Sequence, residues 1–180
     1  MKKAPVALSA LLSVLVAFSA SAGTAADKLT DAMIDQDLID RELAPIKSQI
    51  DMNRYIYSAE AKNSPLRQLS PNALATFMNG LTFTDEGAAS FNMTPLTNNL
   101  TASQVYEVLG LFGMQSAIGT ISNLRVQTES DRMIAASAKE RPNAVWAAPF
   151  ACYNVYQSGR YVGKACLRTS GYMCNLSVCR

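Results

Sequence analysis

The chain ends in ACYNVYQSGRYVGKACLRTSGYMCNLSVCR over residues 151–180, and all four of its cysteines lie in this stretch. Their spacings are C-x13-C, C-x7-C and C-x4-C. A zinc site of four thiolates has paired short knuckles, and a redox pair has the motif C-x-x-C, so neither is expected here. The pattern predicts two structural disulfides and no metal site, formed by Cys152, Cys166, Cys174 and Cys179.

The dipeptide Ser158-Gly159 predicts a β-hairpin whose strands cover residues 153–156 and 161–165. A loop of three residues between these strands would place Cys152 opposite Cys166. Four cysteines allow three pairings, and the sequence does not decide among them. The hairpin register favours one pairing, which is Cys152–Cys166 with Cys174–Cys179.

Tyrosine and basic side chains are interspersed in and beside this predicted hairpin. Tyrosine, tryptophan and arginine dominate the hot spots of binding interfaces. The sequence therefore predicts a binding surface on the tail, made of Tyr153, Tyr156, Arg160, Tyr161, Lys164 and Arg168. The alternative is that these tyrosines, with Tyr172 and Trp146, only cover a small disulfide unit that lacks a core of its own.

The opposite end of the chain has the pattern of a secretory signal peptide. Lys2 and Lys3 precede an apolar stretch, and Ala20-Ser21-Ala22 fits a small-x-small cleavage site. We expect residues 1–22 to be removed, with Gly23 as the first mature residue and cleavage after Ala26 as the alternative. Export predicts a periplasmic or secreted protein without stable membrane insertion after cleavage, in a compartment where disulfides form.

Charge and composition exclude several classes of function. The mature chain carries 14 basic and 14 acidic residues, because Lys2 and Lys3 leave with the signal and residues 1–22 contain no acid. The net charge of zero differs from the excess of basic residues that is typical of a nucleic-acid-binding protein. The chain has no histidine, which excludes Ser-His-Asp and Cys-His catalysis. We expect no cofactor and no catalytic residue.

The charges are unevenly distributed along the chain. Residues 27–51 hold seven acids and three bases, whereas residues 139–180 hold six bases and one acid. Asp27, Asp31 and Asp35 recur every fourth residue and lie on one face of a predicted helix. These acids form either a solvated face, which we favour, or a divalent-cation site.

Hydrophobic spacing and capping signals predict a mainly α fold of four to five helices around one core, with a small β-hairpin tail. The predicted helices cover residues 27–44, 46–61, 71–79, 102–112 and 129–139, with Ser70, Thr101 and Thr128 as N-caps. Residues 81–95 form either two short strands or a loop over the helices. The predicted organisation is a signal peptide (1–22), a helical domain (23–141) and a cysteine-rich tail (142–180) packed on that domain.

The leading hypothesis is an exported bacterial binding or interaction protein without catalytic activity, of the inhibitor, immunity or envelope-assembly type. Its partner is expected to be another protein or an anionic envelope component, and its oligomeric state stays open. One alternative is a hydrolase of envelope polymers that uses carboxylates such as Asp85 and Glu86, which lie in a predicted turn. Another alternative is a secreted effector.

Overall fold

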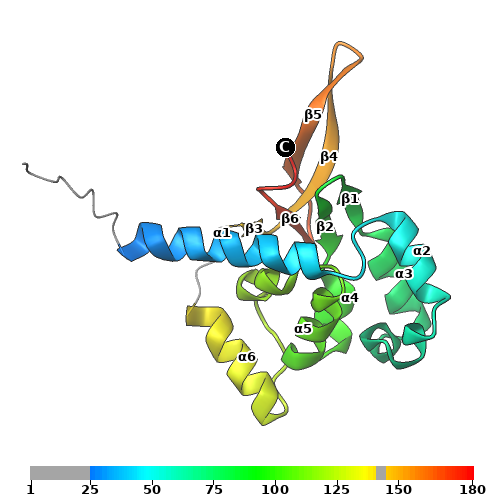
Figure 1. Cartoon of the computed structure of the whole chain (residues 1–180), viewed down its shortest axis with the longest axis vertical. Coiled ribbons are helices and arrows are strands. Elements are labelled where there is room, and N and C mark those ends of the chain that lie inside the picture. Colours follow the sequence, from blue (N-terminus) through cyan, green and yellow to red (C-terminus); the bar gives the residue numbers. More distant parts are fainter. Residues whose placement is uncertain (1–24, 141–144) are drawn as a thin grey trace, which may run out of the picture.

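The computed structural model describes residues 25–140 and 145–180, and the side chains of residues 31–139 and 145–180 (Figure 1). The predicted signal peptide, residues 1–22, and the predicted first residue of the mature chain, Gly23, lie outside the described residues. No helix in the described part of the chain combines the length and the hydropathy needed to cross a membrane.

The predicted helices are present, and their capping residues act as expected. The Ser70 hydroxyl accepts a hydrogen bond from the backbone N–H of Ala73, and Thr101 and Gln104 form a capping box. The segment predicted as one helix over residues 46–61 is shorter and continues as two 3-10 turns. The helices are α1 (Ala25–Leu43), α2 (Gln49–Ile56), η1 (Glu60–Asn63), η2 (Pro65–Gln68), α3 (Pro71–Asn79), α4 (Thr94–Asn99), α5 (Ala102–Gly110), η3 (Gln115–Thr120) and α6 (Glu129–Glu140).

The prediction of a mainly α fold is wrong, because the chain also builds a four-stranded antiparallel sheet and a two-stranded sheet. The larger sheet has the order β1-β2-β6-β3, and the smaller one pairs β4 with β5. Strands from the middle of the chain and from its end thus share one sheet (Figure 1). The strands are β1 (Thr82–Thr84), β2 (Gly87–Asn92), β3 (Trp146–Ala147), β4 (Phe150–Gln157), β5 (Arg160–Arg168) and β6 (Tyr172–Asn175).

The second strand explains why local sequence patterns underestimate the sheet. Strand β2 reads GAASFN, and its first five residues are buried, so it lacks the alternation of a half-exposed strand. Its partner β6 lies far along the chain, with Ser90 opposite Cys174. The expectation of two short strands within residues 81–95 is confirmed, because β1 and β2 pair across the turn at Asp85 and Glu86.

Aromatic rings connect the helices to the sheet inside the main core. Phe77 of α3 contacts Phe91 of β2 and Phe112 edge to face, with ring centroids 6.3 and 5.6 Å apart. Phe91 in turn meets Trp146 of β3 at 5.6 Å. Such pairs contribute about 0.5–1.5 kcal/mol each beyond the area they bury. The predicted helix over residues 102–112 supplies Val105, Val108 and Phe112 to this core.

Helix α1 lies across the body at a position that a glycine makes possible. Gly113 has a φ of +67°, and a Cβ there would lie 2.5 Å from the Cα of Arg41. Only glycine accepts both the left-handed backbone and this close approach. The C-terminal half of α1 therefore sits directly on the segment that follows α5.

Helices α5 and α6 are joined at their N-termini by one buried carboxylate. Asp131 accepts hydrogen bonds from the Ser103 hydroxyl at 2.6 Å and the Ser103 backbone N–H at 2.8 Å. It also accepts from the backbone N–H groups of Gln127 and Thr128, at 3.0 and 2.8 Å. The Ser103 hydroxyl above all, and then the backbone N–H groups, hold the pKa of Asp131 far below its ordinary value of 3.8.

We expect Asp131→Asn to lower the free energy of unfolding at about pH 7, because the amide group of asparagine meets four donors with fewer lone pairs. Below about pH 3.8 the unfolded chain protonates Asp131 while the native chain does not, so the native protein loses this stabilisation as the pH falls. The difference in free energy of unfolding between the native protein and the variant should therefore become smaller towards about pH 3. Urea denaturation at both pH values measures this difference. A difference that does not change with pH would contradict the lowered pKa of Asp131.

Candidate functional site

The β4–β5 hairpin, here called the arm, projects away from the rest of the protein (Figure 1). Its strands pair from Phe150 opposite Arg168 to Gln157 opposite Arg160. Ser158 and Gly159 connect them with φ values of 51° and 80°, the positive values of a type I′ turn. The predicted hairpin is confirmed with Cys152 opposite Cys166, although its connection has two residues rather than three.

An irregularity near the tip brings two tyrosines together. The register shifts between Val155 and Tyr156, so that Val155 lies opposite Gly163 and Tyr156 opposite Tyr161. The extra residue on β5 is Val162, and bulges of this kind re-aim side chains. The two tyrosine rings meet edge to face, with centroids 5.8 Å apart, although 61% of Tyr156 and 49% of Tyr161 stay exposed.

The six residues of the predicted binding surface all lie on the arm, but they do not share one face. Pairing of Asn154 with Lys164 places that lysine on the same face as the tyrosine pair. Tyr153 lies three residues before Tyr156 on β4, and side chains alternate along a strand, so Tyr153 is on the opposite face. There its hydroxyl accepts a hydrogen bond from Thr169. Arg160 stands at the tip and Arg168 at the base.

The remaining aromatic residues of the tail, Trp146 and Tyr172, do not lie on the arm. Trp146 is buried against the main core, so it does not belong to an exposed surface. Its indole N–H donates to Asp37, which keeps the ring in one orientation. Tyr172 of β6 lies in the four-stranded sheet, opposite Asn92.

The arm is positively charged and apolar at once. Between Phe150 and Arg168 the chain has three bases and no acid. None of the ion pairs formed among the described residues includes Arg160, Lys164 or Arg168. Large apolar side chains are exposed beside these charges: Tyr153, Tyr156, Tyr161, Val162 and Leu167.

Two disulfides attach the base of the arm to the last residues of the chain. All four cysteines are paired, as predicted, but the favoured pairing is wrong: the bridges are Cys152–Cys179 and Cys166–Cys174. Cys152 and Cys166 lie opposite each other and therefore face the same side of the hairpin. The C-terminal segment packs on that side, so each cysteine pairs with a cysteine from there.

A small second core surrounds these bridges. Ala89 of β2 and Val178 are buried with the cysteines, and Phe150 packs against them. The backbone N–H of Cys152 donates to the buried Ser90 hydroxyl at 3.0 Å, which ties β4 to β2. The base of the arm is thus fixed by covalent bonds, by packing and by a buried hydrogen bond, while its outer half has none of these supports.

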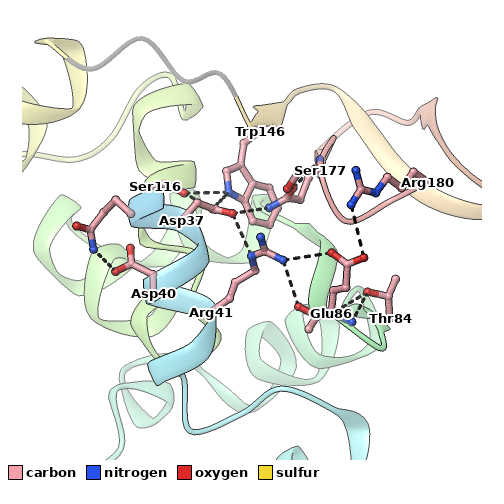
Figure 2. Close-up of polar contacts among 12 residues, drawn as sticks. Asp37, Asp40, Arg41, Thr84, Glu86, Ser116, Trp146, Ser177 and Arg180 are labelled. Carbon is pink, nitrogen blue, oxygen red and sulfur yellow. Dashed lines mark hydrogen bonds and ion pairs between the residues drawn. The ribbon is translucent and has the colours of Figure 1, made fainter. Parts of the chain in front are cut away.

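A buried polar network then connects this base to α1, and Figure 2 shows it. Asp37 is only 1% exposed and accepts from the Ser116 hydroxyl at 2.7 Å and the Trp146 indole N–H at 3.2 Å. Its second oxygen accepts from the Arg41 Nε at 3.1 Å and the Asn175 amide at 3.3 Å. Since these donors come from α1, η3, β3 and β6, the carboxylate joins four separate elements.

Of the two turn acids considered for catalysis, Glu86 lies at the edge of this network. Glu86 forms ion pairs with Arg41 at 3.7 Å and with Arg180 at 3.9 Å, as Figure 2 shows. Its backbone carbonyl also accepts from Arg41 at 3.4 Å. Asp85 is exposed beside it. Glu86 therefore helps to hold α1 and the chain end against the β1–β2 turn.

The described acids and cysteines show no built metal centre. Asp31 and Asp35 of the acidic stripe are exposed, while the side chain of Asp27 lies outside the described set. The cysteines Cys152, Cys174 and Cys179 cluster within 4.8 Å, but all three are in disulfides and offer no thiolate. The acid that sequence analysis missed is Asp37, because no spacing rule separates it from its exposed neighbours on the same helix.

Comparison of the chain with family models, curated proteins and solved structures finds no match. The arguments for function therefore depend on the geometry of the arm and of its attachment.

Proposed function

We propose that this chain is an exported, non-catalytic binding protein, and that the arm docks on an acidic surface of a partner protein in the periplasm or outside the cell. The observation that carries this proposal is the exposed Tyr156–Tyr161 pair on an arm whose base is anchored by two disulfides. The two rings pack across the strands, yet 61% of Tyr156 and 49% of Tyr161 stay exposed, which leaves apolar ring surface available to a partner. Such rings are typical anchors of protein interfaces.

The mixture of side chains favours a protein over an anionic polymer as the partner. The arm has three bases spread over its whole length, without the dense cationic run that polyanion binding uses. Exposed Val162 and Leu167 add apolar area that a charged glycan would leave uncovered. A patch of acidic residues around an apolar depression on a partner would match both features.

Rigid attachment supports the same function energetically. Binding loses affinity for each side chain or loop that it must order. The disulfides, the Ser90 hydrogen bond and the second core order the base of the arm before any partner arrives. Tyrosines add large contact areas with few rotatable bonds, so little conformational entropy is lost at the tip.

We expect Arg160→Ala and Tyr161→Ala each to weaken partner binding by more than about 1 kcal/mol, or about fivefold. The partner is first captured from envelope extract with the mature protein, then purified, and its affinity for each variant is measured by calorimetry. Tyr106→Ala and Lys139→Ala remove an exposed tyrosine and an exposed lysine outside the arm, and they serve as matched controls.

Thermal unfolding separates the two explanations for the tyrosines. If they only cover the disulfides, Tyr161→Ala lowers the melting temperature and Arg160→Ala changes nothing. If both variants lose affinity while their melting temperatures stay unchanged, the result supports the arm as the binding site. Unchanged affinity in both variants, with affinity lost in either control, would move the binding surface to the helical body.

A further inference from the structure

A groove on the helical side of the protein is formed by α2, η1, η2 and α3, which lie together at the right of Figure 1. Its volume is about 570 Å³, within the range of about 300–1,000 Å³ that is usual for small-molecule sites. The lining is mostly apolar, and its main side chains are Tyr55, Ile56, Ala61, Leu66, Leu74 and Met78.

The groove has a preformed floor and wall. Leu66 is buried in the main core, and Tyr55, Leu74 and Met78 pack against that core. Ser64 caps η2 through a hydrogen bond from the Leu66 N–H, which fixes the wall between the two 3-10 turns. A ligand would therefore meet an apolar surface that exists before binding.

Two cations stand at one rim of this apolar surface. Lys62 and Arg67 are both exposed, and the Arg67 guanidinium donates to the Lys62 carbonyl at 3.5 Å, which brings the two residues together. Across the described part of the chain, no carboxylate pairs with either cation, although Glu60 lies on the same turn as Lys62.

We propose that this groove binds a single-chain amphiphile with an anionic head group, such as a fatty-acid carboxylate. The apolar lining buries the chain, and the head group lies at the rim between Lys62 and Arg67. Burial of apolar surface supplies most of the affinity. The two cations select a negative head over a neutral one. This site is separate from the arm, so it does not depend on the proposed function.

The test uses decanoate below its micellar concentration and decanol as the neutral match, titrated calorimetrically into the mature protein. We expect saturable binding of one decanoate per chain. The double variant Lys62→Ala/Arg67→Ala should weaken decanoate binding about tenfold and leave decanol binding unchanged. Lys139→Ala, which removes an exposed lysine elsewhere, should bind decanoate like the native protein.

Filling the groove tests its location. Ala61→Trp should abolish the binding of both ligands, and Leu74→Trp on the facing wall is the second filling variant if the first lowers the melting temperature. Absence of saturable decanoate binding, or binding that survives both folded variants, would overturn the site. Equal binding of decanol and decanoate, with no effect of the double variant, would overturn the anionic head group.

Discussion

Replacing Asp37 by alanine is expected to lower the free energy of unfolding by about 3–5 kcal/mol, the usual loss when one partner of a buried ion pair is removed. The variant leaves the Arg41 guanidinium, whose side chain is only 10% exposed, the Trp146 indole N–H and the Asn175 amide without their shared acceptor. Arg41 keeps Glu86, at a longer distance. Urea denaturation measures the change, and hydrogen exchange should show earlier opening of α1 than in the native protein.

Asp35→Ala is the matched control for this variant, because Asp35 is an exposed acid on the same helix. Exposed substitutions usually change stability by less than about 0.5 kcal/mol. A double-mutant cycle with Arg41→Ala isolates the direct coupling between the two charged groups. Equal small effects of Asp35→Ala and Asp37→Ala would contradict the view that this carboxylate holds α1 to the sheet.

Removal of the Cys152–Cys179 bridge by a double alanine substitution is expected to cost about 3.5 kcal/mol. Loss of the Cys166–Cys174 bridge should cost about 2.5 kcal/mol. Both values follow from the entropy of the unfolded loop, since the bridges span sequence separations of 27 and 8 residues. Denaturation curves of the two variants measure the loss in free energy of unfolding for each bridge. The loss should be larger for the Cys152–Cys179 bridge, which closes the longer loop.

These bridges should also affect partner binding, because both join the arm to the chain end. We expect either double variant to bind its partner more weakly, even at temperatures where the helices remain folded. Peptide mapping without reduction provides the check on the pairing itself. Recovery of a Cys152–Cys166 peptide from native protein, or a larger loss of stability from the shorter bridge, would contradict the assignment.

The helices could be predicted from the sequence because their signals are local. Ser70-Pro71 and the Thr101–Gln104 capping box each mark a helix start within four residues, and the structure has helices there. The arm could be predicted for the same reason, since Ser158-Gly159 specifies a turn between adjacent strands. Local signals of this kind extend over about the length of one helix or one hairpin.

The sheet and the disulfide pairing required information that local patterns do not contain. Ser90 meets Cys174 through contacts between distant parts of the chain, and a strand of small residues gives no alternating signal. Cys152 and Cys166 lie opposite each other, as the predicted hairpin register requires, but the disulfide pairing depends on where Cys174 and Cys179 approach the hairpin. The role of Asp37 also cannot be predicted from local patterns, because its hydrogen-bond donors come from four elements.

The most direct test of the binding arm is site-specific photocrosslinking in cells that export the protein. A photoreactive phenylalanine, which keeps an aromatic ring at the site, replaces Tyr161 on the arm, or Tyr106 on α5 as the control, since the two native tyrosines are similarly exposed. We predict that position 161 crosslinks to one partner protein, that Arg160→Ala reduces the yield, and that position 106 gives no such product. Crosslinks to that partner from position 106 but none from position 161 would contradict the assignment of the arm as the binding site.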